Sequence, residues 1–188
     1  MPCGIVSGLA CATCEDLQSV GGIKAKNIYV GSLSDLTDSG FTKDVEGVVT
    51  AIGLQPYNYL YKFCAKTKSA GASQELVTGE NNIKSFTQTI TGKFQQQTQD
   101  AKNVWDNLKL LDDMFVVIEK TNGTFELYGE AAGLEITALT KATGVLIGDD
   151  NSYNVTLSQP MGGEQLLAPD FFITSYAATK AYLESKLV

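Results

Sequence analysis

Residues 85–120 read SFTQTITGKFQQQTQDAKNVWDNLKLLDDMFVVIEK, and this stretch decides the fold. Its first part, Ser85–Phe94, alternates cleanly: Phe86, Ile90 and Phe94 fall on one side, with threonines and Lys93 on the other. Strict alternation of this kind is typical of a strand with one buried face. The end of the stretch, Phe115–Lys120, alternates as well. The sequence therefore predicts two strands joined through a helix.

The predicted helix runs from about 100 to 113. Its apolar residues recur at the three- and four-residue spacings of one helix face, at Ala101, Val104, Trp105, Leu108 and Leu111. Thr98 is placed to cap the first turn, and an acid follows near the positive end of the helix dipole. We therefore interpret the single tryptophan as a core anchor that lies over a sheet.

Further alternating segments flank this stretch on both sides. The predicted strands are 27–32, 41–52, 57–66, 124–130, 133–138 and 152–158. Asn122-Gly123 favours a tight hairpin between the strand at 115–120 and the next one. Together these segments predict an α+β, mainly β fold. We expect a two-sheet antiparallel β-sandwich or barrel flanked by one central α-helix, with an N-terminal arm and a C-terminal helix at about 175–187.

A chain of 188 residues is expected to form one domain with attached arms. Residues 1–24 carry no clear period and read as an extended arm, residues 25–172 as the sandwich domain, and residues 173–188 as the terminal helix. Residues 66–82 are rich in turn formers around a small apolar island, so we predict a long loop there. It is either an interaction loop that orders against another subunit or a flexible hairpin tip.

The amino-acid composition argues against most kinds of catalytic site. The chain has no His, all fourteen basic residues are Lys, and the net charge is −7. Without His the usual nucleophile–base pairs are excluded, and without Arg an acidic chain is a poor ligand for nucleic acid. Asp112-Asp113 has no third acid nearby, and Asp149-Asp150-Asn151 does not fit a calcium loop. We predict no enzyme activity, no catalytic or metal-binding residues and no cofactor.

Four cysteines are present, at Cys3, Cys11, Cys14 and Cys64. The spacing of Cys11 and Cys14 suits half of a zinc site or a redox pair, and the other two would have to complete a zinc site. A disulfide within the pair or with Cys64 is a second interpretation, and free, partly buried thiols are the third.

The first residues lack the pattern of a signal peptide, and no apolar run is long enough to cross a membrane. We therefore expect folding in a cytoplasm, without a membrane partner.

Two late segments carry a resemblance to a known family. Residues 144–158 read GVLIGDDNSYNVTLS, and residues 163–169 read GEQLLAP. Together with the order of elements over about 27–172, they resemble the tail tube proteins of tailed bacteriophages, whose fold is shared with contractile injection systems. The resemblance implies a virion structural protein that forms hexameric rings, which stack around a β-lined channel for DNA. The long loop at 66–82 corresponds to the segment that reaches the adjacent ring in that family.

The resemblance also implies the partners. They are other copies of the chain and other phage tail or neck proteins, with DNA passing through the lumen without specific binding and assembly in the host cytoplasm. The expected subunit contacts are Lys68, Glu75, Leu76, Val77 and Glu80 in the loop, and Tyr57, Tyr59 and Tyr61 in the aromatic segment. We expect acids on the lumen face, where they would repel phosphates. The alternatives are a tail-completion or connector ring protein, or a monomeric, adhesin-like β-sandwich binding module.

Overall fold

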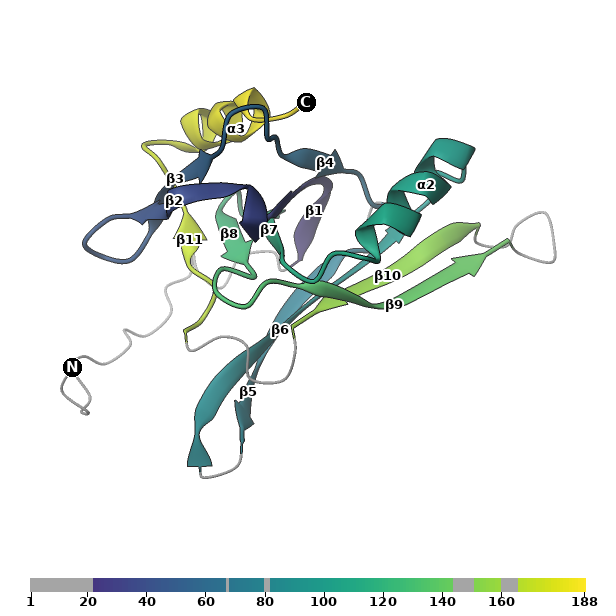
Figure 1. Cartoon of the computed structure of the whole chain (residues 1–188), viewed down its shortest axis with the longest axis horizontal. Coiled ribbons are helices and arrows are strands. Elements are labelled where there is room, and N and C mark those ends of the chain that lie inside the picture. The colour runs from purple at the N-terminus through teal and green to yellow at the C-terminus, as the bar shows by residue number, and fades with distance from the viewer. Residues whose placement is uncertain (1–21, 67, 80–81, 144–150, 160–165) are drawn as a thin grey trace.

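The computed structural model of the chain describes residues 22–66, 68–79, 82–143, 151–159 and 166–188 (Figure 1). Within these residues the chain is mainly β. The strands are β1 (Ile23–Ser32), β2 (Leu36–Lys43), β3 (Val49–Leu54), β4 (Tyr61–Phe63), β5 (Gly71–Thr78), β6 (Lys84–Phe94), β7 (Met114–Lys120), β8 (Phe125–Tyr128), β9 (Glu135–Ala142), β10 (Ser152–Ser158) and β11 (Asp170–Phe171). The helices are the 3-10 turn η1 (Leu33–Asp35), α2 (Gln99–Leu108) and α3 (Tyr176–Ser185).

The described strands form two sheets. One has seven strands in the order β2-β3-β11-β8-β7-β1-β4, and the other has four in the order β5-β6-β10-β9. Every pairing is antiparallel except the short one between β11 and β3, at Phe171 and Val49. The mainly β, two-sheet fold expected from the sequence is confirmed. Neither sheet closes on itself, so the open sandwich is the correct form and the barrel is not.

β7 lies at the centre of the molecule, and its residues explain why. Six of its seven residues are buried, so both faces of the strand are covered. Val116 and Ile118 face a core shared with the four-stranded sheet, where they meet Ile90. Phe115 and Val117 face a second core on the other side of the seven-stranded sheet. An apolar run without polar interruptions is what a doubly covered strand requires.

The second core is closed by α3. Leu183 and Thr179 of this helix are fully buried, and the hydroxyl of Tyr182 bonds to the backbone of Ile52 in β3, accepting from its N–H at 2.9 Å. The predicted C-terminal helix therefore exists and docks on its own domain.

α2 begins where the sequence predicts. Thr98 caps it by accepting a hydrogen bond from the N–H of Ala101 at 3.2 Å. The helix ends at Leu108, earlier than expected, because the chain must turn to deliver Met114 into β7. Leu111 consequently lies outside the helix and is exposed rather than part of its apolar stripe.

Several predicted strand boundaries are wrong. The segment 41–52 is not one strand but the end of β2, a turn and β3, because Asp44 accepts hydrogen bonds from the backbone N–H groups of Glu46 and Val48 and so holds a turn. Within 57–66 only Tyr61–Phe63 is a strand. The strand predicted at 27–32 begins earlier, at Ile23, and the one predicted at 133–138 is β9, Glu135–Ala142. Residues 1–21 of the predicted arm lie outside the described part.

The long loop predicted at 66–82 is also wrong as secondary structure. Gly71–Thr78 forms the eight-residue strand β5, which pairs with β6 from Gly71 opposite Thr91 to Thr78 opposite Lys84. Its small and polar residues resemble a loop in isolation, but they complete the edge of a sheet whose buried side is supplied mainly by β6. The predicted hairpin at Asn122-Gly123, by contrast, is present between β7 and β8.

Candidate functional site

The four-stranded sheet has two free edges among the described residues. β5 pairs only with β6 and β9 pairs only with β10, so each offers one row of unpaired backbone groups. Along β9 the five residues from Thr137 to Lys141 are all exposed. Free, extended edges are templates for pairing with another chain unless something protects them.

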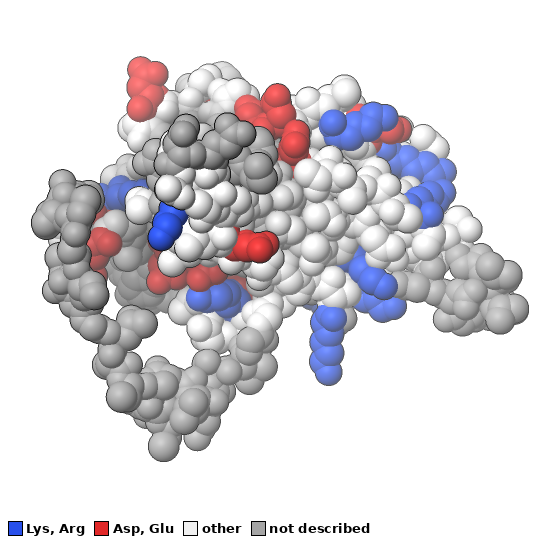
Figure 2. Space-filling view, turned by 90° about the horizontal axis from the view of Figure 1, so that it is seen from below, with Lys and Arg blue, Asp and Glu red and all other residues white. Residues whose placement is uncertain are grey.

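The outward face of this sheet carries mostly hydroxyl and small side chains. Strand registry sets Ser73, Thr89, Thr91, Thr140, Thr156 and Ser158 on one side. The charged residues in the same register are Glu75, Glu135 and Lys93. Figure 2, which views the molecule from the side of this sheet, shows an uncharged area across the middle with charged side chains around it. The face is therefore polar, regular and nearly neutral.

The β5–β6 hairpin extends beyond the body of the sandwich (Figure 1). Its turn is held by a hydrogen bond from the N–H of Gly79 to the carbonyl of Ile83. Leu76 and Ile83 are 53% and 66% exposed near its end, so the projecting part carries exposed apolar side chains.

The predicted contact residues of this region do not all lie on one surface. Glu75 and Val77 share the outward face with Thr87 and Ser85, whereas Leu76 lies on the opposite face. Lys68 precedes the hairpin and is exposed, with a left-handed backbone at φ 60°. Glu80 lies outside the described residues.

The three predicted tyrosines lie elsewhere. Tyr57 occupies a turn with φ 69°, Tyr59 lies in an irregular segment, and Tyr61 belongs to β4 at the edge of the other sheet. All three are exposed. β4 and the tip of the β5–β6 hairpin lie at opposite ends of the molecule in Figure 1, so the structure does not bring the tyrosines and the loop residues together.

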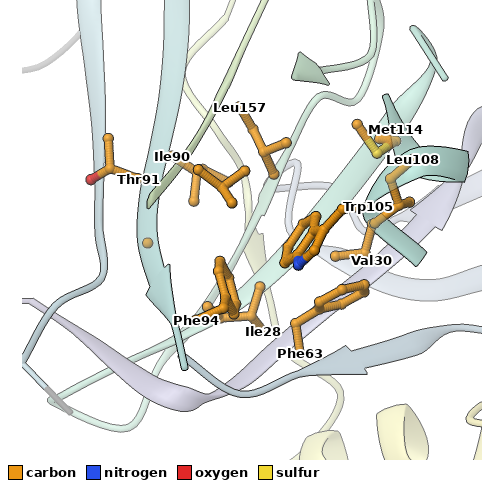
Figure 3. A pocket seen from close by; sticks show the side chains of 12 residues that line it. Ile28, Val30, Phe63, Ile90, Thr91, Phe94, Trp105, Leu108, Met114 and Leu157 are labelled. Atoms are coloured by element: carbon orange, nitrogen blue, oxygen red, sulfur yellow. The ribbon is translucent and has the colours of Figure 1, made fainter. Parts of the chain in front are cut away.

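A small cavity lies between the two sheets beneath α2 (Figure 3). Its volume of about 30 Å³ is far below that of a ligand pocket. Its lining is apolar and includes Ile28, Leu157 and Trp105, whose ring lies 5.1 Å from that of Phe94. Trp105 is thus the core anchor that its helix position predicts, and the cavity offers no group for chemistry.

Glu119 is the most completely enclosed ionised group of the described chain. Its carboxylate accepts hydrogen bonds from Lys24, Asn27 and, at 2.7 Å, the hydroxyl of Tyr176. Burial raises the pKa of this carboxyl, but the hydrogen bonds from Lys24, Tyr176 and Asn27 outweigh it and hold the pKa below its usual range. Both carboxylate oxygens accept hydrogen bonds, so Glu119 connects β7 to β1 and to the start of α3.

Asp113 also has a structural role. It accepts hydrogen bonds from the hydroxyl of Ser32 at 2.7 Å and the N–H of Ser34 at 3.0 Å. Burial raises the pKa of Asp113, and these bonds lower it further than burial raises it. The second carboxylate of the Asp112-Asp113 pair therefore holds η1 in place.

No group of three metal-ligating side chains occurs in the described part of the chain. Cys64 is exposed and unbridged there, while Cys3, Cys11 and Cys14 lie outside it, as do Asp149 and Asp150. Among the described helices none is long and apolar enough to cross a membrane.

No protein-family model, curated protein or solved structure matches this chain. A function is therefore proposed from the fold and from the two open edges of the four-stranded sheet.

Proposed function

We propose that this chain is a structural subunit that assembles edge to edge into rings, and that the rings stack into a tube of the kind found in phage tails. The observation that carries the proposal is the four-stranded sheet, which ends, among the described residues, in a strand with one open edge on each side. In a ring, β9 of one copy pairs with β5 of the next, so every copy uses both of its edges.

This arrangement has a physical reason. A contact between two different edges is heterologous, and such contacts close into a ring when the rotation between copies divides a full turn. Closure removes the exposed backbone groups that would otherwise promote aggregation. The resemblance of the chain to tail tube proteins supports six copies in the ring.

The lining of such a ring would be the outward face of the four-stranded sheet. Two acids, Glu75 and Glu135, and one base, Lys93, leave the described part of this face with a net charge of −1 in each copy, so the lining would be weakly acidic. Serine and threonine hydroxyls hydrate well, and the chain has no Arg to clamp phosphates. Among the described residues of this wall Lys93 is the single cation, so DNA would meet few groups that could hold its phosphates.

An edge variant tests ring formation. In Ala138→Glu with Thr140→Glu, two exposed positions of β9 acquire charge that would face Glu75 of the next copy across the join. The control variant, Val45→Glu with Thr174→Glu, adds the same charge at exposed positions outside the sheet. Analytical ultracentrifugation and negative-stain microscopy of particles should show rings or tubes for the control and monomers for the edge variant.

Rings from both variants would show that β9 is not the joining edge. A control that stays monomeric at every concentration, including with other tail and neck proteins as initiators, would favour the monomeric binding module. Single rings that never stack would favour a connector or tail-completion protein. In the tube assignment the chain resides in the virion after assembly in the host cytoplasm.

A further inference from the structure

The tip of the β5–β6 hairpin and an apolar groove lie at the two ends of one strand. β6 begins at Lys84, opposite Thr78 beside the hairpin turn, and ends at Phe94. Phe94 lines a groove of about 450 Å³ between β4 and α2. The length of β6 separates the two features by about 33 Å. The tip and the groove consequently lie toward opposite ends of the molecule (Figure 1).

The groove has an apolar floor and an exposed rim. Phe63 and Trp105 lie at its floor with their ring centroids 5.6 Å apart (Figure 3). Val104 of α2 and Tyr61 of β4 also line it, and they are 42% and 56% exposed. Residues 187–188 form one wall, where the C-terminal segment already bridges the chain just before β4. The groove is therefore suited to receive apolar side chains and not a further strand.

The hairpin tip carries side chains of the kind that this groove would accept. Leu76 and Ile83 are large, apolar and more than half exposed beside the turn. Exposed apolar groups that are gathered at a projecting end of a protein mark a contact with another molecule. Because β6 is continuous between the two features, the tip cannot reach the groove of its own chain. The groove that it can reach is the groove of another copy.

The charges along the four-stranded sheet favour the same head-to-tail contact. Toward the hairpin its strands carry the acids Glu75 and Glu135 and the base Lys84. Toward the groove they carry Lys93, next to Phe94, and Lys141, which faces Tyr153 in register. Figure 2 shows lysine side chains gathered on the side of the molecule on which α2 lies in Figure 1. One end of the sheet is thus weakly acidic and the other basic, so unlike charges approach when the ends of two copies meet.

The groove itself adds one more base. Among its described lining residues Lys62 is the single charged side chain, and it pairs with Glu184 at 3.4 Å on the surface. This ion pair lies at the rim and leaves the aromatic floor free of charge. An apolar tip can therefore enter the groove without burying an unpaired charge.

We propose that the groove between β4 and α2 receives the hairpin tip of a copy in the adjacent ring, with Leu76 and Ile83 packed against its aromatic floor. The inference rests on the proposed function, because it names the surface that the stacking contact uses. Two different surfaces at opposite ends of the molecule make a heterologous contact, which propagates as an open stack. Each copy in a ring offers one tip and one groove, so several small contacts act together.

Cross-linking between the hairpin and Cys64, which is exposed and lines the groove, tests this contact. Ile83→Cys, in a chain that also carries Cys3→Ser, Cys11→Ser and Cys14→Ser, places one thiol at each end of the molecule. A short bismaleimide should link position 83 of one chain to Cys64 of the next. Because every chain has one tip and one groove, a denaturing gel should show a ladder of dimers, trimers and longer products.

The matched control replaces Ile83→Cys by Val45→Cys, a fully exposed position between β2 and β3. It should give at least fivefold less cross-linked product. Mass spectrometry of the linked peptides identifies the two positions. Links between two copies of position 83 alone would stop at dimers, and they would overturn the proposal.

A groove variant supplies a second readout. Val104→Asp should form rings but no tubes in negative-stain images, with an unchanged circular dichroism spectrum, whereas Val45→Asp should form both. Tubes without the link from position 83 to Cys64, normal tubes from Val104→Asp, or rings that neither stack nor cross-link would overturn this inference and leave ring formation standing. The ladder without rings would support the contact and overturn the ring. Neither ladder nor rings would overturn both.

Discussion

Glu119 shows how a single carboxylate can connect elements that are distant in the sequence. It lies on β7, accepts from Lys24 and Asn27 on β1, and accepts from Tyr176 at the start of α3. The pKa of the folded carboxyl is below that of the unfolded one. The stabilising contribution of the charged form is therefore complete above the unfolded pKa and is lost as the pH falls through the folded pKa.

We expect Glu119→Gln to lower the free energy of unfolding at neutral pH by about 2 kcal/mol, because hydrogen bonds to a buried charged group are replaced by neutral ones. The acid limb of the stability curve should also become flatter. Urea unfolding followed by circular dichroism from pH 3 to pH 7 measures both effects. Glu130→Gln is the control, since its surface ion pair with Lys43 should contribute less than about 1 kcal/mol.

Gly31 on β1 has no room for a side chain. A Cβ atom there would lie 2.5 Å from the ring of Phe115 and 2.9 Å from Leu60, both fully buried. Gly31→Ala should therefore cost about 1–3 kcal/mol of stability through overpacking. Gly71→Ala is the control, because its nearest neighbour is 3.7 Å away. Equal stability of the two variants in urea would contradict this account of the core.

At the scale of elements, Trp105 is the one buried residue of α2, and Leu108 is partly buried against the same core. Trp105 contacts Phe63, Phe94 and Tyr153 with ring centroids 5.1 to 6.0 Å apart. Its neighbour Val104 is 42% exposed. Adjacent positions of one helix thus differ sharply in burial, which allows a matched comparison.

We expect Trp105→Ala to lower the free energy of unfolding by about 3–5 kcal/mol, because a large buried aromatic side chain is lost. Val104→Ala should change it by less than about 1 kcal/mol, because the valine is partly exposed. Denaturant unfolding followed by circular dichroism avoids dependence on the tryptophan signal. Comparable losses in the two variants would mean that the helix is not anchored through its tryptophan.

At the scale of the whole molecule, the projecting β5–β6 hairpin is the candidate contact between stacked rings. Deleting residues 68–80 would remove all of β5 from the four-stranded sheet, so it could abolish ring formation as well as stacking and would not test stacking alone. Leu76→Asp with Ile83→Asp changes only exposed apolar side chains near the hairpin tip. This variant should form rings but no tubes in negative-stain images, whereas Val45→Asp should form both. Tubes of normal length from the hairpin variant would remove the hairpin from the stacking contact.

The sequence by itself determined the strands that carry a strong periodic signal. β6, β7 and β10, the cap of α2 and the hairpin at Asn122-Gly123 could all be predicted, because each is encoded by local alternation, capping or turn chemistry. The buried position of Trp105 followed from its place in an apolar helix stripe. The absence of His and Arg from the chain also removed whole classes of chemistry before any contact was known.

Only the tertiary structure decided the rest. The sequence of β5 is typical of a loop, because its residues are small, polar and mostly not buried. It forms a strand because it pairs with β6, and an edge strand needs few apolar residues of its own. Three residues distant in the sequence donate hydrogen bonds to Glu119, and the three tyrosines lie far from the hairpin. Both arrangements depend on the order of the strands, which local sequence patterns do not encode. The sheet that an edge belongs to, and the charge of the face beside it, are properties of long-range pairing, and the proposed assembly depends on these pairings.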